Sequence, residues 1–114
     1  MASVQQLKQA LERCVAGGQC QFLTYGQFSK QFGFGPFALA WANRPVLDDV
    51  AAALKQDPNV GLDLTFLLRN ADTGYPSVTD GQPSKPPTQR QMTRAQQVAQ
   101  QIINKYCPGT RNPY

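Results

Sequence analysis

The middle of the chain runs from Thr24-Tyr25-Gly26 through Gly33-Phe34-Gly35-Pro36 and Asn43-Arg44-Pro45 to Arg69-Asn70-Ala71-Asp72-Thr73-Gly74-Tyr75-Pro76. Glycine and proline recur in these stretches, and both residue types interrupt regular secondary structure. We therefore expect short helices, one strand and a polar turn instead of a few long elements. This pattern predicts an α+β fold.

Working outward, four further signals predict helices. Ser3 precedes apolar residues at three- and four-residue steps, which end before Gly17-Gly18. Thr24 is placed to cap a second helix that stops at Gly33. A third helix is expected between Asn43 and Asp57-Pro58, because Pro45 suits a first helical turn. Thr88 and Gln91 fit a capping box before a C-terminal helix.

The strand signal lies after the third helix. Leu62, Leu64, Phe66 and Leu68 alternate with other residues, which is typical of a half-buried strand over residues 62–69. A turn at 70–74 follows, and residues 75–79 are expected to return as an edge strand, since Pro76 cannot donate to a central ladder.

The predicted architecture is therefore one compact domain over residues 1–114, with four to five helices and a small antiparallel sheet or hairpin. Its core is expected within residues 22–81, with a connector over 80–88 and a C-terminal helix over 89–106. A length of 114 residues and 41% hydrophobic content suit one core and not two.

Charge is distributed unevenly along the chain. Residues 1–47 carry four basic residues and one acid, residues 48–80 carry two and six, and residues 81–114 carry five and none. The net charge of the three parts is thus +3, −4 and +5. A basic C-terminal third can attract phosphate backbones, or it can pair with the acidic segment of the same chain or of a second subunit.

No membrane segment or targeting signal is evident, so we expect a cytoplasmic protein that is not attached to a membrane. Cys14, Cys20 and Cys107 are an odd number without metal-type spacing. In a cytoplasmic chain these thiols are expected to be reduced, with Cys14 on the apolar stripe of the first helix.

Catalytic chemistry has little support in the residues. The chain contains no histidine to activate a thiol or complete a zinc site. Asp48 and Asp49 are adjacent on a predicted helix, so their side chains diverge by about 100° and form no acid and base pair. We predict no catalytic residue, no metal and no cofactor, and an enzyme is not favoured.

Two resemblances can be stated. Thr24-Tyr25-Gly26 opening a short helix with a glycine stop resembles the start of the winged-helix domain of the alkylguanine DNA alkyltransferases and their non-catalytic relatives. The match covers about ten residues, and the Pro-Cys-His-Arg motif is missing, so alkyl transfer cannot be carried over.

More widely, residues 22–81 resemble a small bacterial family associated with mobile elements and integron gene cassettes. The segments that carry this resemblance are Tyr25-Gly26, Gly33 to Pro36, Asn43-Arg44-Pro45-Val46-Leu47 and Leu64 to Pro76. This resemblance implies a compact α+β domain and does not indicate any enzymatic reaction.

Our leading hypothesis is a non-enzymatic interaction or small-ligand-binding protein of a mobile element that self-associates as a homo-oligomer. Aromatic residues are dense between residues 22 and 41, where Phe34 and Phe37 accompany the candidates named below, and this density favours a groove or interface. The candidate binding residues are Tyr25, Trp41, Arg44, Arg69, Asn70 and Tyr75. For residues 70–74 the competing interpretation is that Asn, Asp and Gly are there only because they form a turn through local hydrogen bonds.

The alternative is a winged-helix-like protein that binds nucleic acid. Its candidate phosphate contacts are Lys30, Arg44, Arg90 and Arg94. No set of residues for reading base edges accompanies them.

Overall fold

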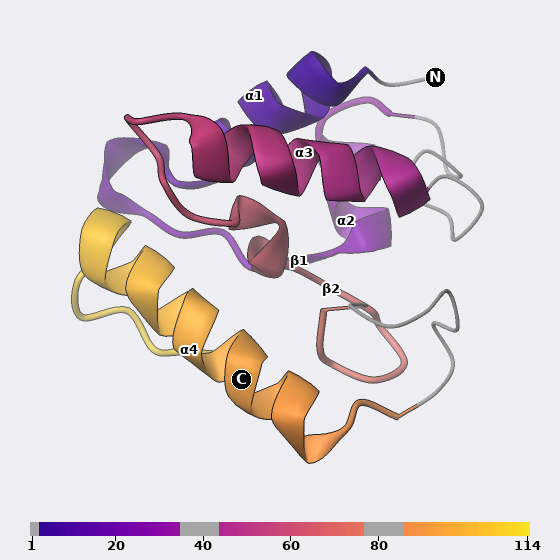
Figure 1. Ribbon diagram of the computed structural model, residues 1–114, viewed down its shortest axis with the longest axis vertical. Helices are drawn as coiled ribbons and strands as arrows, with labels where there is room; N and C mark the ends of the chain where they lie inside the picture. The colour runs from indigo at the N-terminus through magenta and orange to yellow at the C-terminus, as the bar shows by residue number, and fades with distance from the viewer. Residues whose placement is uncertain (1–2, 35–43, 77–85) are drawn as a thin grey trace.

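Four α-helices frame the part of the chain that the structure describes. The structure is a computed structural model that describes residues 3–34, 44–76 and 86–114 (Figure 1). The elements follow in the order α1 (Val4–Cys14), η1 (Ala16–Gly18), β1 (Leu23–Thr24), α2 (Tyr25–Gln31), α3 (Arg44–Gln56), η3 (Leu64–Leu67), β2 (Leu68–Arg69) and α4 (Gln89–Tyr106), where η denotes a 3-10 helix. The predicted α+β class and helix positions are confirmed at this level.

Three helices begin with the caps that their sequences predict. The side chains of Ser3, Thr24 and Thr88 each accept a hydrogen bond from the backbone N–H three residues later, at 3.1, 3.2 and 3.2 Å. The glutamine at that later position accepts in return from the N–H of the cap residue. These capping boxes satisfy backbone donors that a helix start otherwise leaves unpaired.

The strand predicted over residues 62–69 is wrong for most of its length. Leu64–Leu67 form η3, and the extended part is Leu68–Arg69. The carboxylate of Asp63 accepts hydrogen bonds from the backbone N–H of Thr65, at 3.0 Å, and from its hydroxyl. Such local side-chain bonds compete with strand pairing. Leu67, which alternation places on the polar face, is fully buried.

The predicted antiparallel sheet or hairpin is also wrong among the described residues. β1 and β2 pair in parallel, with Leu23 opposite Leu68 and Thr24 opposite Arg69. Tyr75 and Pro76 belong to no strand, and the rest of the expected returning strand, residues 77–79, lies outside the described residues. Parallel partners need a long connection. Residues 25–67 supply it, and no local pattern reveals such a pairing.

The core is built around η3. This 3-10 helix contacts α1, α3 and α4, and Figure 1 shows it between α3 and α4. The residues packed there are exposed by 1% or less: Leu7, Leu11, Cys14, Phe28, Val50, Leu54, Leu64, Leu67, Leu68 and Ile102. The radius of gyration is 13.0 Å, close to the value of about 13 Å expected for one folded body of this length.

A short network of charges ties α1 to the end of α3. The ammonium group of Lys8 lies 2.7 Å from Glu12 and 2.8 Å from Asp57. The hydrogen bond from Lys8 holds the pKa of Asp57 below its usual value, helped by a bond from the backbone N–H of Asn59. In the same way, Asp57 and Glu12 raise the pKa of Lys8.

The cysteines correct one expectation and confirm another. Cys20 and Cys107 form a disulfide with a Cα–Cα distance of 5.9 Å, so the expected reduced thiols are wrong for this pair. Nothing in the local sequence pairs them, because 87 positions separate them. Cys14 is a free thiol that is fully buried in the core, as predicted. Burial raises its pKa to about 11, which keeps it protonated and unreactive.

None of the described helices combines the length and the apolar character that crossing a bilayer needs.

Candidate functional site

Four of the predicted binding residues gather where β1 and β2 end. Because the strands run in parallel and Thr24 lies opposite Arg69, the residues that follow, Tyr25 and Asn70, lie at the same edge. Tyr75 returns to this edge, since the backbone N–H of Asn70 donates to its carbonyl oxygen at 2.9 Å. We call the group Tyr25, Arg69, Asn70, Tyr75 and Tyr114 the strand-end site.

The turn that brings Tyr75 back has the chemistry expected from its sequence. The side-chain oxygen of Asn70 accepts from the N–H of Asp72 at 2.8 Å, and Gly74 N–H donates to the carbonyl of Asn70 at 2.8 Å. Gly74 has a φ of 75°, a conformation that favours glycine. The turn interpretation of residues 70–74 is therefore confirmed, and it explains Asn70 without a ligand.

Tyr114 occupies the strand-end site, and sequence analysis missed it. Its ring stacks on Tyr75 with centroids 5.6 Å apart and meets the edge of Phe22 at 5.9 Å. Its hydroxyl donates to the carbonyl oxygen of Phe66 at 2.8 Å. Burial raises the pKa of Tyr114 well above the usual range, and Arg69 offsets part of that rise. No sequence pattern places this residue, because its ring and its hydroxyl contact residues that are distant in the chain.

Arg69 is the charged member of the strand-end site. It is half-buried, and Lys8 accounts for both ion pairs found among the described residues, so no described carboxylate pairs with Arg69. The site therefore combines one guanidinium with three tyrosine rings. These groups can bind an acidic group or a flat molecule.

Two predicted binding residues are not placed by the structure. Trp41, like Phe37, lies outside the described residues. Arg44 begins α3, and its side chain also falls outside the described part. Their binding role stays a prediction.

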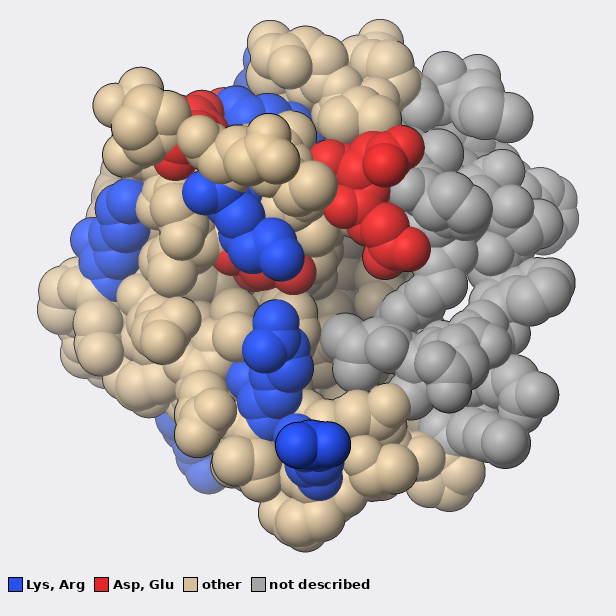
Figure 2. Space-filling view, in the orientation of Figure 1, with Lys and Arg blue, Asp and Glu red and all other residues tan. Residues whose placement is uncertain are grey.

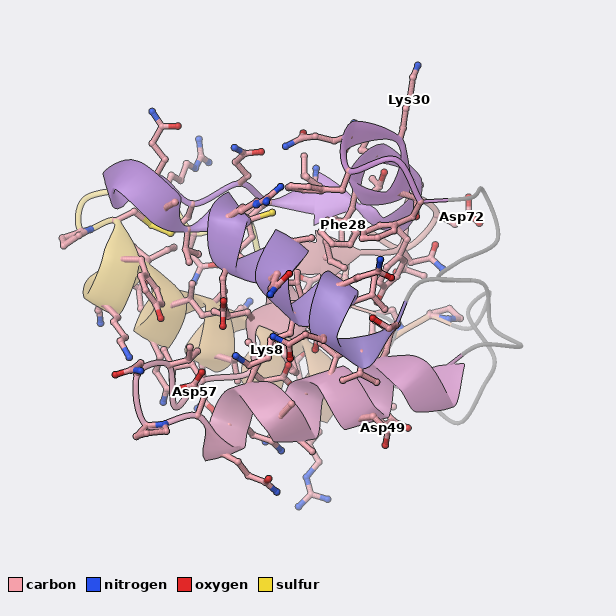
Figure 3. All side chains as sticks on the ribbon, turned by 90° about the horizontal axis from the view of Figure 1, so that it is seen from above. Lys8, Phe28, Lys30, Asp49, Asp57 and Asp72 are labelled. Carbon is pink, nitrogen blue, oxygen red and sulfur yellow. A yellow bond between two sulfur atoms is a disulfide. The ribbon has the colours of Figure 1, made fainter. Side chains whose placement is uncertain are left out.

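The three candidate phosphate contacts whose side chains are described come from different elements, Lys30 from α2 and Arg90 and Arg94 from α4. Figure 3 shows Lys30 pointing away from the body on the side of α2. Arg90 and Arg94 are exposed on α4, which packs on η3, and the guanidinium of Arg94 lies 5.7 Å from the centre of the Phe66 ring. A nucleic-acid surface usually gathers its basic residues in one patch or stripe.

Opposite charges do share one face. On the side that faces the viewer, Figure 2 shows acidic side chains over the N-terminal end of α3, a basic side chain nearer its other end, and basic side chains over the N-terminal half of α4. Asp48 and Asp49 are exposed on α3, and Arg90 and Arg94 are exposed on α4. Asp49 points outward in Figure 3. We call these four residues the charged face.

The charged face is not neutralised within the described part of the chain. The ion pairs found there join Lys8 to Glu12 and Asp57, so none uses Asp48, Asp49, Arg90 or Arg94. Elsewhere the basic C-terminal third does act on the acidic segment of its own chain, because the charge of Lys105 contributes to the lowered pKa of Asp57. No group of three or more potential metal ligands occurs among the described residues.

Comparisons with protein-family models, with curated proteins and with solved structures each find no match to this chain. The resemblances to the mobile-element family and to the alkyltransferase domain therefore stay predictions.

Proposed function

We propose that this chain is a non-enzymatic interaction protein that self-associates through the charged face. One observation supports the proposal: acidic side chains over α3 and basic side chains over α4 share the face shown in Figure 2, and the exposed residues Asp48, Asp49, Arg90 and Arg94 of these helices form no ion pair within the described chain. A two-fold dimer brings a patch of one copy against a different patch of the other, and the reverse contact forms at once. The acidic residues of each copy then face the basic residues of the other copy, so the same contact forms twice.

The strength expected from these contacts is modest. Exposed ion pairs contribute about 0.2–1 kcal/mol each, and the dimer can form four of them. Charges on this face also help to align the two copies as they meet. The upper end of this range, about 4 kcal/mol, corresponds to a dissociation constant on the order of 1 mM, so we expect a weak, salt-sensitive dimer.

Charge-swap variants test this function. In sedimentation equilibrium at low salt, the wild type is expected to dimerise and to dissociate in about 1 M NaCl. Asp48→Lys/Asp49→Lys and Arg90→Glu/Arg94→Glu should each be monomeric, because like charges then face one another. An equimolar mixture of the two should form a heterodimer, because the swapped faces are complementary again.

Lys30→Glu is the matched control, since Lys30 points away from the body on the α2 side. It should dimerise like the wild type. A wild type that stays monomeric at concentrations on the order of 1 mM in low salt would contradict the proposal. So would a mixture of the two swapped variants that fails to associate while both remain folded.

Nucleic-acid binding remains the second candidate, with weaker support. It depends on the basic residues of α4, which the charged face also uses. Fluorescence anisotropy with short duplex and single-stranded oligonucleotides at low salt separates the two functions. A phosphate contact predicts binding that Arg90→Glu/Arg94→Glu abolishes and that Asp48→Lys/Asp49→Lys strengthens.

Cytoplasmic location and origin in a mobile element stay predictions. The Cys20–Cys107 disulfide weighs against the cytoplasm, because disulfides persist mainly in oxidising compartments. Trapping thiols with a maleimide reagent during cell lysis tests the location. A disulfide that forms in the cytoplasm of a reducing host would remove this objection.

A further inference from the structure

A small cavity lies between α1 and the chain that follows α2. Its volume is about 170 Å³. The residues that line it are Gln6, Gln9, Ala10, Arg13, Phe32 and Phe34. The four from α1 recur at three- and four-residue steps, so they lie on one face of that helix, next to the face that packs into the core. The cavity is distinct from both the strand-end site and the charged face.

Two aromatic rings form its apolar wall, and the core holds them in place. The ring of buried Phe28 lies 5.0 Å from that of Phe32 and 5.7 Å from that of Phe34, between centroids. Gly33, with a φ of 74°, reverses the chain between the two rings. The N–H of Phe34 then donates to the carbonyl of Ser29 at 2.8 Å. Ring walls fixed in this way need little reordering when a ligand enters.

The polar side of the cavity carries donors and a positive charge. Glu12 precedes Arg13 in α1, but the carboxylate of Glu12 lies 2.7 Å from the ammonium group of Lys8, and the described residues that line the cavity include no acid. No described carboxylate forms an ion pair with Arg13. Gln6 uses its carbonyl oxygen to cap α1, which leaves its amide NH₂ group as a donor. A guanidinium beside amide donors suits a carboxylate, which it can bind with two parallel hydrogen bonds.

We propose that this cavity binds a small flat carboxylate: one six-membered ring with one acidic group. A cavity of about 150 Å³ holds a single benzene molecule, so about 170 Å³ accommodates one ring and little more. Phe32 and Phe34 contact the ring, and Arg13 binds the carboxylate at the open side. Ala10 keeps the space free, because it is a small residue that is 5% exposed at the wall of the cavity.

Benzoate is the probe, and benzamide, which has the same shape without the charge, is its control. Ligand-observed saturation-transfer NMR detects the contact, and amide shifts of Ala10 and Phe34 locate it. The expected dissociation constant for benzoate is on the order of 1 mM, as befits a ligand of this size. Benzamide should bind at least about tenfold more weakly, because it lacks the charge that Arg13 recognises.

Two variants and one control test the assignment. Arg13→Gln is an exposed change that should weaken benzoate about tenfold and bring it level with benzamide. Ala10→Leu should abolish binding of both probes by filling the space, and circular dichroism checks that the variant is folded. Arg111→Gln removes an exposed arginine that does not line the cavity and should leave both affinities unchanged.

Three results would overturn the proposal. They are the absence of saturable benzoate binding up to about ten times the expected constant, equal binding of benzoate and benzamide, and full benzoate affinity in Arg13→Gln. Because none of these measurements depends on dimerisation, the failure of this site and the failure of the charged face can be told apart.

Discussion

The disulfide between Cys20 and Cys107 provides the sharpest test of the fold. It joins the segment before β1 to the residue that follows α4, across a sequence separation of 87. Closing a loop of that length lowers the entropy of the unfolded chain by about 15 cal/mol/K in the chain-entropy model. At 25 °C this is about 4–5 kcal/mol of stability. The total free energy of unfolding of a small domain is about 5–15 kcal/mol, so the disulfide contributes a large share of it.

Urea unfolding of the Cys20→Ala/Cys107→Ala variant measures this contribution. With a slope of about 1.5–2 kcal/mol per M, the midpoint should fall by about 2–3 M relative to the oxidised wild type. Dithiothreitol should shift the wild type to nearly the same midpoint and leave the variant unchanged. The reasoning would be refuted by a wild type that reductant does not shift, or by native, unreduced protein in which Cys20 and Cys107 react with a thiol reagent.

Two further predictions concern the core and the charge network. Phe28→Ala should cost about 3–5 kcal/mol in urea unfolding, because Phe28 is fully buried between two other rings, and a loss below about 1 kcal/mol would contradict this packing. Asp57→Asn should make stability less dependent on pH. The lowered pKa of Asp57 gives a contribution that is complete above about pH 5 and is lost as the pH falls through the lowered value, so the deficit of the variant should be present at about pH 6 and shrink towards about pH 3. Asp48→Asn, an exposed change outside the network, is the control, and an Asp57→Asn deficit that does not vary with pH would show that the Lys8 contact is not responsible.

The predictions that succeeded rest on bonds between near neighbours. Ser3, Thr24 and Thr88 each meet a glutamine three residues later, so the capping boxes could be read directly from the sequence. The same holds for the turn at residues 70–74, whose hydrogen bonds stay within a few residues. Structures of this kind can be predicted from sequence, because both bonding partners lie within a few residues of each other.

The errors arose where a local pattern had two solutions. Alternating leucines over residues 62–69 predict a strand, yet Asp63 starts a 3-10 turn and η3 buries Leu67 as well as Leu64. A segment packed by α1, α3 and α4 can bury residues on all its sides. Burial by several neighbours, which the alternation cannot encode, therefore selected η3 over a strand.

The ends of the helices and the apolar stripe of each helix follow from the sequence, because capping and periodicity act over one or two turns. Four features depend on tertiary packing: the parallel pairing of β1 with β2, the Cys20–Cys107 bond, the place of Tyr114 at the strand-end site and the cavity beside Arg13. Each of these joins segments that are distant in the chain. Such contacts depend on how the packed helices bring their surfaces together, and no short stretch of sequence records that arrangement.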